Sequence, residues 1–123
     1  MGKRVLDVGQ CGFDGPRLRK MLREKVGAEV ECADTLEDAR AKLQKAAFDL
    51  VMVNRELARD RSSGIEVIRA VLMEWPGTKV MLVSDRAAAQ EEAIKLGAVR
   101  GFGKANLFAQ ETEDLVCGEL GGC

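Results

Sequence analysis

The stretch FDLVMVN, residues 48–54, is the most apolar run of the chain and lies near its middle. Short runs rich in valine and leucine are typical of strands that are buried on both faces of a parallel sheet. Asp49 stands near the start of the run and Asn54 ends it, where a polar loop over residues 55–63 begins. We therefore predict a central strand over residues 48–53, with Asn54 at its carboxyl end.

On both sides of this strand, short apolar runs alternate with segments that have helical periodicity. Gly27 and Gly97 each follow such a segment, and glycine commonly ends a helix. Strands are predicted over residues 3–8, 28–33, 79–83 and 99–103, and helices over residues 14–26, 35–46, 65–75, 87–96 and 107–117. Five strands that alternate with five helices imply βαβ crossovers and a parallel sheet covered on both faces.

The length of 123 residues suits a single domain. We expect a doubly wound, flavodoxin-like α/β domain over residues 1–123, with strand order 2-1-3-4-5. Its core is predicted over residues 3–117, followed by a tail over residues 118–123. The functional crevice of such a sheet lies beyond the carboxyl ends of its strands. The residues expected at this crevice are Gly9, Gln10, Asn54, Ser84 and Lys104.

The chain resembles the receiver domains of response regulators over roughly residues 3–104. The resemblance rests on KRVLDVGQ (3–10), FDLVMVN (48–54), TKVMLVS (78–84) and GAVRGFGK (97–104). Receivers carry an acidic pair after the first strand, an acceptor Asp after the third, a Thr or Ser after the fourth and a Lys after the fifth. By this resemblance only Ser84 and Lys104 keep the family's residue types.

The other positions depart from the family pattern. Gly9 and Gln10 occupy the acidic pair, and Asn54 occupies the acceptor position. Gly101 stands where receivers carry a switching aromatic residue, with Phe102 one place later. The loop between residues 54 and 64 is about two residues longer than is usual in the family.

These departures remove the chemistry of aspartyl phosphorylation. The reaction needs a carboxylate nucleophile, and the amide of Asn54 is neutral with a delocalised nitrogen lone pair. Mg²⁺ needs oxygen ligands, which usually include one or two carboxylates. We therefore predict a non-enzymatic pseudo-receiver that is independent of phosphorylation and holds no metal or cofactor.

Other acidic residues near the crevice have simpler interpretations. Asp7 lies within the first strand, where a buried carboxylate needs a partner or a raised pKa. Asp14 is expected to cap the following helix, and Glu56 and Asp85 are expected to be solvated. Without the acidic pair, Lys104 is expected to pair with Asp7 or Asp85, or to extend into water without a role in function. Ser84 is expected to cap the helix that follows it.

The loop VGQCGFDG, residues 8–15, supports an alternative function. Gly9, Gly12 and Gly15 lie between a strand and a helix, as in a dinucleotide-binding loop, and Glu31 or Asp34 could serve as the ribose acid. The spacing is G-x-x-G-x-x-G and departs from the G-x-G-x-x-G fingerprint. Glycines that only satisfy the geometry of the loop are the simpler interpretation.

Composition limits the compartment and the class of partner. The formal net charge is −1 and no apolar run approaches the roughly 20 residues that span a bilayer, so neither nucleic acid nor a membrane is expected as partner. The chain has no histidine and no C-x-x-C pair, which argues against structural zinc. We expect a cytoplasmic protein with reduced thiols and Cys32 in the core. A disulfide or metal clip between Cys117 and Cys123 is the alternative for the terminal cysteines.

The resemblance also suggests where a partner binds. In the family, the face built from the fourth helix, fifth strand and fifth helix commonly contacts protein partners or forms homodimers. The matching residues here are 87–96, 99–103 and 107–117. We expect a protein partner at this face, with a homodimer as the alternative.

Overall fold

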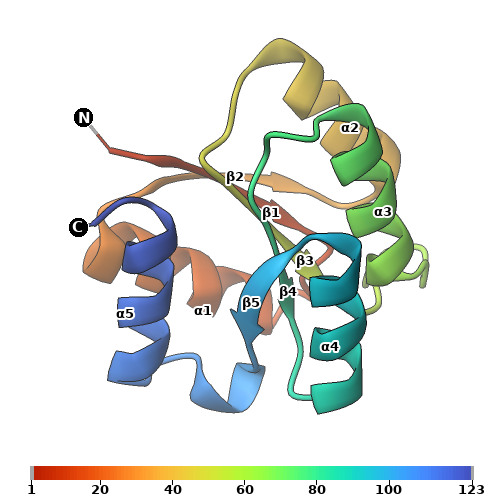
Figure 1. Ribbon diagram of the computed structural model, residues 1–123. Helices are drawn as coiled ribbons and strands as arrows, with labels where there is room; N and C mark the ends of the chain where they lie inside the picture. The colour runs from red at the N-terminus through yellow and green to blue at the C-terminus, as the bar shows by residue number, and fades with distance from the viewer. Residues whose placement is uncertain (1, 123) are drawn as a thin grey trace.

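The predicted alternation of strands and helices is present in the computed structural model, which describes residues 2–122 (Figure 1). The parallel strands follow the predicted order β2-β1-β3-β4-β5, so the doubly wound, flavodoxin-like fold is confirmed. The strands are β1 (Arg4–Val8), β2 (Glu29–Ala33), β3 (Leu50–Asn54), β4 (Val80–Val83) and β5 (Val99–Phe102). The helices are α1 (Asp14–Met21), α2 (Leu36–Lys45), α3 (Gly64–Glu74), α4 (Ala87–Leu96) and α5 (Gln110–Glu119). A π-helix η1 (Leu22–Val26) follows α1, and a 3-10 helix η2 (Lys104–Asn106) follows β5.

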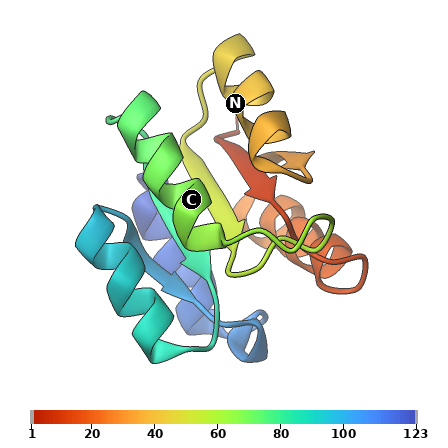
Figure 2. The same cartoon turned by 90° about the vertical axis from the view of Figure 1, so that its right-hand side faces the viewer.

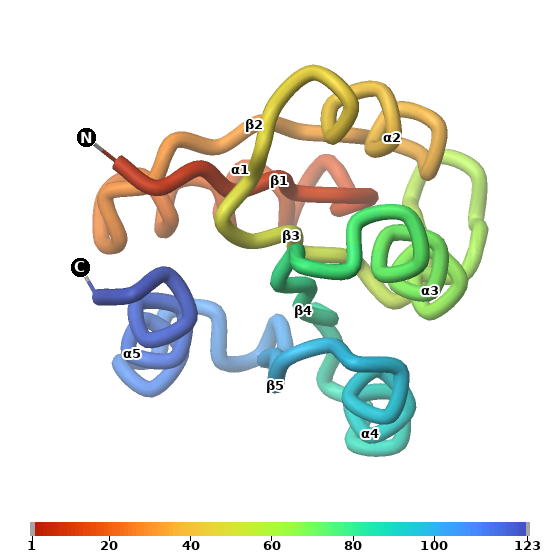
Figure 3. The backbone as a smooth tube through the Cα atoms, turned by 45° about the horizontal axis from the view of Figure 1, so that its top comes forward, coloured from red at the N-terminus to blue at the C-terminus, as the bar shows by residue number. Residues whose placement is uncertain are grey.

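The sheet divides the core into two apolar layers, because successive side chains of a strand point to opposite faces. Val51 and Val53 of β3 pack with α2, α3 and α4 on one face, the layer nearest the viewer in Figure 2. Leu50 and Met52 pack with α1, η1 and α5 on the other face (Figure 3). All five residues of β3 are buried, which explains the continuous apolar run that marked this strand in the sequence.

The first helix differs from its prediction at both ends. Its N-cap is Phe13, which makes no side-chain hydrogen bond, so the prediction that Asp14 caps the helix is wrong. After Met21 the chain continues as the π-helix η1, which ends at Gly27 in the left-handed conformation (φ 74°). The apolar periodicity located the segment and its end, but it does not distinguish an α-helix from a π-helix.

The last helix begins later and ends later than predicted. Leu107 is buried between η2 and α5 and serves as an anchor ahead of the helix. α5 runs to Glu119, and the next residue, Leu120, is buried in the core. The core therefore extends a few residues beyond residue 117.

Two of the four cysteines are free thiols with different surroundings. Cys11 is partly buried, and Cys32 is exposed on the edge strand β2. The prediction that Cys32 belongs to the core is therefore wrong, because β2 has a neighbouring strand on one side only. The predicted alternative for Cys117 and Cys123 involves a residue outside those that the structure describes. Across residues 2–122, none of the helices has the length and apolar content that crossing a membrane requires.

Candidate functional site

The carboxyl ends of the strands bring most of the predicted site residues together. A cavity of about 300 Å³ lies there, lined by Asn54, Arg55, Glu56, Val83, Ser84, Asp85, Arg86 and Lys104. Gly9 adjoins it through a hydrogen bond from Asn54. The side chain of Gln10 lies instead against Gly15 at the start of α1. The crevice predicted from the strand order therefore exists, without Gln10.

Asn54 uses its amide nitrogen to close one side of the cavity. Nδ2 donates to the backbone oxygen of Gly9 at 3.1 Å and to that of Glu56 at 2.8 Å. Both partners are carbonyl oxygens, so only the nitrogen of the amide can serve them. The side chain is buried, and its role here is that of a donor that ties the end of β3 to the end of β1.

Leu57 fills the space next to Gly9. Gly9 has a φ of 76°, in the left-handed region that favours glycine, and a Cβ atom added there would collide with the Leu57 side chain. Leu57 is fully buried, and the next residue, Ala58, donates its N–H to the Gly9 oxygen at 3.0 Å. The loop after β3 therefore folds back over the end of β1. An acidic side chain at position 9 has no room.

The residues at this edge do not fit the Mg²⁺ ion that phosphorylation would require. Gly9 offers no side chain, Leu57 offers carbon, and Asn54 presents N–H groups to its neighbours. Among residues 2–122, no group of three or more Asp, Glu, Cys or His side chains is placed to hold a metal ion. Asp85 lines the cavity, but its carboxylate already accepts the backbone N–H of Ala105.

Asp7 lies below the crevice on the face covered by α1. It is 1% exposed, and its Oδ2 pairs with the Arg19 guanidinium at 3.0 Å. Burial raises the pKa of Asp7 to about 6, and the nearby Arg19 and Gln10 only partly oppose this. Asp7 Oδ1 and both polar atoms of Gln10 are buried without a hydrogen bond of normal geometry among the described residues. The sequence-based expectation of a partner or a raised pKa is thus met in both respects.

Lys104 pairs with Asp14, which corrects the expected pairing with Asp7 or Asp85. Lys104 Nζ lies 3.0 Å from Asp14 Oδ2, which also accepts from Cys11 Sγ at 3.3 Å. Although burial opposes it, the contacts with Lys104 and Cys11 hold the pKa of Asp14 below its usual range. This pair links the start of α1 to the start of η2.

Ser84 stabilises a turn and does not cap α4. Its Oγ accepts the backbone N–H of Arg86 at 3.1 Å, and Arg86 itself is the N-cap residue of α4. The prediction that Ser84 caps this helix is therefore wrong by two residues.

Comparison with known proteins places this geometry in a family. Residues 16–110, most of the chain, match the family described as "Response regulator receiver domain". The chain belongs to this receiver family. No match among curated protein sequences reaches significance.

Solved receivers share the fold at low sequence identity. The receiver domain of NtrX from Brucella abortus is 22% identical with a TM-score of 0.75, and the match covers 94% of this chain and 96% of that one. A putative response regulator from Chloroflexus aurantiacus is 19% identical with a TM-score of 0.86, covering 98% and 99%. The chemotaxis protein CheY4 from Vibrio cholerae is 26% identical with a TM-score of 0.64, covering 83% and 85%. The chain is therefore similar to receiver domains of two-component response regulators.

The pairing of β4 with β5 in this receiver is stabilised by a side chain that the sequence analysis missed. The register of β4 and β5 shifts between Met81 and Val83, which interrupts the ladder at Leu82. Gln90 of α4 bridges the gap: Nε2 donates to the oxygens of Leu82 (2.9 Å) and Ser84 (3.1 Å), and Oε1 accepts the Gly101 N–H (3.1 Å). A Cβ atom at Gly101 would collide with the Leu82 oxygen. Gly101 and Gln90 thus form one local structure that joins α4 to both strands.

We expect Gln90→Ala to lower the free energy of unfolding by about 1–2 kcal/mol, because it leaves two carbonyls and one N–H without their partner. Denaturant unfolding measures the change. Gln110→Ala is a matched control, since Gln110 is exposed and bonds only Asp114, and it should change stability by less than about 0.5 kcal/mol. Equal effects from the two variants would contradict the bridging role of Gln90.

The sequence analysis missed the contacts of three residues around the site: Leu57, Arg19 and Gln90. Each acts through a contact between elements far apart in sequence, which periodicity does not report. The longer loop after residue 54 was the one sequence signal for Leu57. A buried aspartate within a strand was the corresponding signal for Arg19.

Proposed function

We propose that this receiver domain is independent of phosphorylation and acts as a protein-protein interaction module in signalling or regulation. The observation that carries the proposal is the use of Asn54 as a double hydrogen-bond donor at the predicted acceptor position. The donating amide nitrogen of Asn54 cannot take up a phosphoryl group or bind Mg²⁺. The carbon atoms of Leu57 cannot do so either.

A fixed β4–β5 edge supports the same proposal. A phosphorylation switch needs two conformations whose balance the phosphoryl group shifts. Here position 101 has no side chain to reorient, and Gln90 fixes the backbone at that point. A domain held in one conformation offers a constant surface, which suits binding to a partner without a phosphorylation signal.

The α4-β5-α5 face is the surface that we propose for the partner. Arg100 of β5 lies between a hollow of about 340 Å³ beside α4 and one of about 260 Å³ beside α5. Ile94 of α4 is 44% exposed at the rim of the first hollow. Two hollows with an exposed aliphatic residue beside them suit a protein with protruding apolar side chains. A second copy of the chain is the alternative occupant.

Nothing in the glycine loop favours the dinucleotide alternative. Asp14 places a carboxylate in the first turn of α1, where a pyrophosphate would have to sit. The two candidate ribose acids already pair with cations, Glu31 with Lys42 and Asp34 with Arg59. The prediction that the loop is a structural turn therefore stands as our proposal.

We expect incubation with acetyl phosphate and Mg²⁺ to leave the protein unmodified, because no carboxylate stands at the end of β3. Intact-mass spectrometry under neutral conditions measures the result. A receiver with its acidic residues intact serves as the positive control for the reagent. One added, base-labile phosphoryl group on this chain would overturn the proposal.

A further inference from the structure

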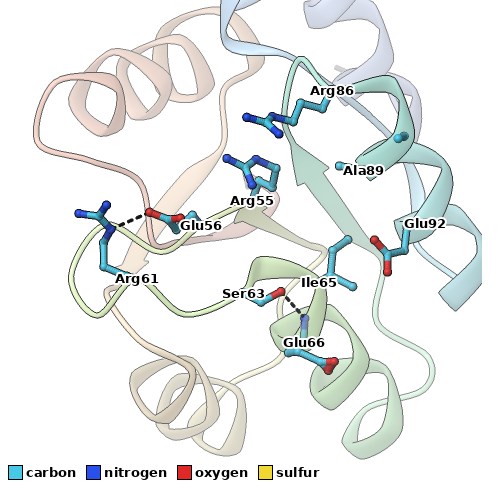
Figure 4. A pocket seen from close by; sticks show the side chains of 10 residues that line it. Arg55, Glu56, Arg61, Ser63, Ile65, Glu66, Arg86, Ala89 and Glu92 are labelled. Atoms are coloured by element: carbon cyan, nitrogen blue, oxygen red, sulfur yellow. Dashed lines mark hydrogen bonds and ion pairs between the residues drawn. The ribbon is translucent and has the colours of Figure 1, made fainter.

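Two arginines at the crevice have no acidic partner among residues 2–122. Arg55 follows β3 and Arg86 precedes α4, and both line the 300 Å³ cavity and the adjoining cavity of about 460 Å³. In Figure 4 Arg55 and Arg86 lie at the end of the larger cavity away from Glu66, and their guanidinium groups point the same way. Neither guanidinium makes an ion pair or hydrogen bond with any of residues 2–122. Two like charges held together without a counter-ion are stabilised by a bound anion.

Further donors lie around the same cavity. Ser84 is buried, and its hydroxyl accepts from Arg86 N–H while its own proton is donated to none of the described residues. Lys104 lines the cavity too, although Asp14 neutralises much of its charge. The carboxylates nearby are engaged: Glu56 pairs with Arg61, and Asp85 accepts from the backbone of Ala105. Glu92 lines only the larger cavity.

We propose that the smaller cavity binds a compact oxyanion non-covalently, with phosphate or a small phosphate monoester as the ligand. Guanidinium groups match the oxygen geometry of phosphate through paired N–H donors. The Ser84 hydroxyl adds a further hydrogen-bond donor to those of the two arginines. Arg55 and Arg86 supply the charge in this site, and no bond to the protein forms. The site therefore does not rest on the proposed function, since a protein that cannot be phosphorylated can still bind phosphate.

Titration of the ¹⁵N-labelled protein with inorganic phosphate, at constant ionic strength set with chloride, tests the proposal. We expect saturable shifts of the amide signals at residues 55, 84 and 86, with a Kd below about 1 mM. Arg55→Gln and Arg86→Gln should each weaken binding at least about fivefold. Arg100→Gln removes an exposed cation that lies outside the cavity and pairs with none of the described residues, and it should weaken binding less than about twofold.

A parallel titration with glycerol 3-phosphate distinguishes the two sources of the ligand. Tighter binding of the ester would identify a phosphorylated small molecule, and tighter binding of inorganic phosphate would identify the free ion. Shifts that do not saturate by about 20 mM phosphate would overturn the proposal. So would an equal loss in Arg100→Gln and Arg86→Gln, because binding would then depend on net charge alone. Arg86 is exposed, so its variant tests the site without threatening the fold.

Discussion

Asn54→Asp should destabilise the protein by about 2–4 kcal/mol at pH 7, although it restores the residue type that receivers carry at this position. The variant replaces an amide nitrogen with a second oxygen. That oxygen would face the backbone oxygens of Gly9 and Glu56, which Asn54 now bonds at 3.1 and 2.8 Å. The Glu56 oxygen would lose this donor, the Gly9 oxygen would keep only the Ala58 N–H, and a buried carboxylate would stand beside them. Urea unfolding of the two proteins measures the difference.

Two comparisons separate this effect from a simple change of charge. Asn106→Asp makes the same substitution at an exposed side chain and should change stability by less than about 0.5 kcal/mol. Lowering the pH should reduce the deficit of Asn54→Asp, because a protonated carboxyl can again donate one hydrogen bond. A variant more stable than the parent would show that the amide contacts of Asn54 do not hold the loop.

The same variant should also fail to become a phosphorylation site. A carboxylate at position 54 would still lack an acidic pair, since Leu57 occupies the space beside Gly9. Acetyl phosphate with Mg²⁺ should therefore leave Asn54→Asp unmodified in an intact-mass measurement. A phosphorylated variant would mean that the site lost only its nucleophile, and that the loop can move aside for a metal ion.

The fold was predictable because its signals are local and repeated. Each strand is a short apolar run, and glycines such as Gly27 end helices in a conformation that other residues rarely adopt. The errors lie at boundaries, where apolar periodicity and backbone hydrogen bonding diverge. Leu107 reads as the first turn of a helix from its apolar side chain, yet it is buried ahead of α5. Such a residue contributes to the core whichever element it belongs to.

The positions of the candidate site were predictable, whereas its interactions were not. Strand order brings Gly9, Asn54, Ser84 and Lys104 to one edge of the sheet. The sequence does not show which cation meets which anion, and Lys104 proved to pair with Asp14. It also shows that position 9 lacks a side chain, but not that Leu57 fills the space. The two cases have different consequences. A single substitution could restore a missing side chain, but it could not restore the site while Leu57 fills the space.

The protein should lose about 3 kcal/mol of stability at Asp7 as the pH rises from about 4 to about 6. Burial raises the pKa of this carboxyl from 3.8 to about 6 in the folded state, despite the ion pair with Arg19. Between these values the folded protein holds a proton that the unfolded chain has released, so raising the pH favours unfolding. Below this window both states are protonated, and above it both are ionised, so the contribution becomes constant at each end.

Asp7→Asn isolates this contribution, because an amide keeps the shape of the protonated carboxyl and does not titrate. The stability of the parent minus that of Asp7→Asn, measured by chemical denaturation at a series of pH values, should fall through the window and then level off. For Asp60→Asn the same difference should rise with pH, since hydrogen bonds from Ser62 hold the pKa of the exposed Asp60 below its usual range. Arg19→Gln should extend the fall in the stability contribution of Asp7 to higher pH, because the ion pair lowers the Asp7 pKa.

A stability difference between parent and Asp7→Asn that does not change with pH would mean that water or a rearranged Gln10 solvates the carboxylate in the folded protein. A rise with pH would mean that the Arg19 pair outweighs burial.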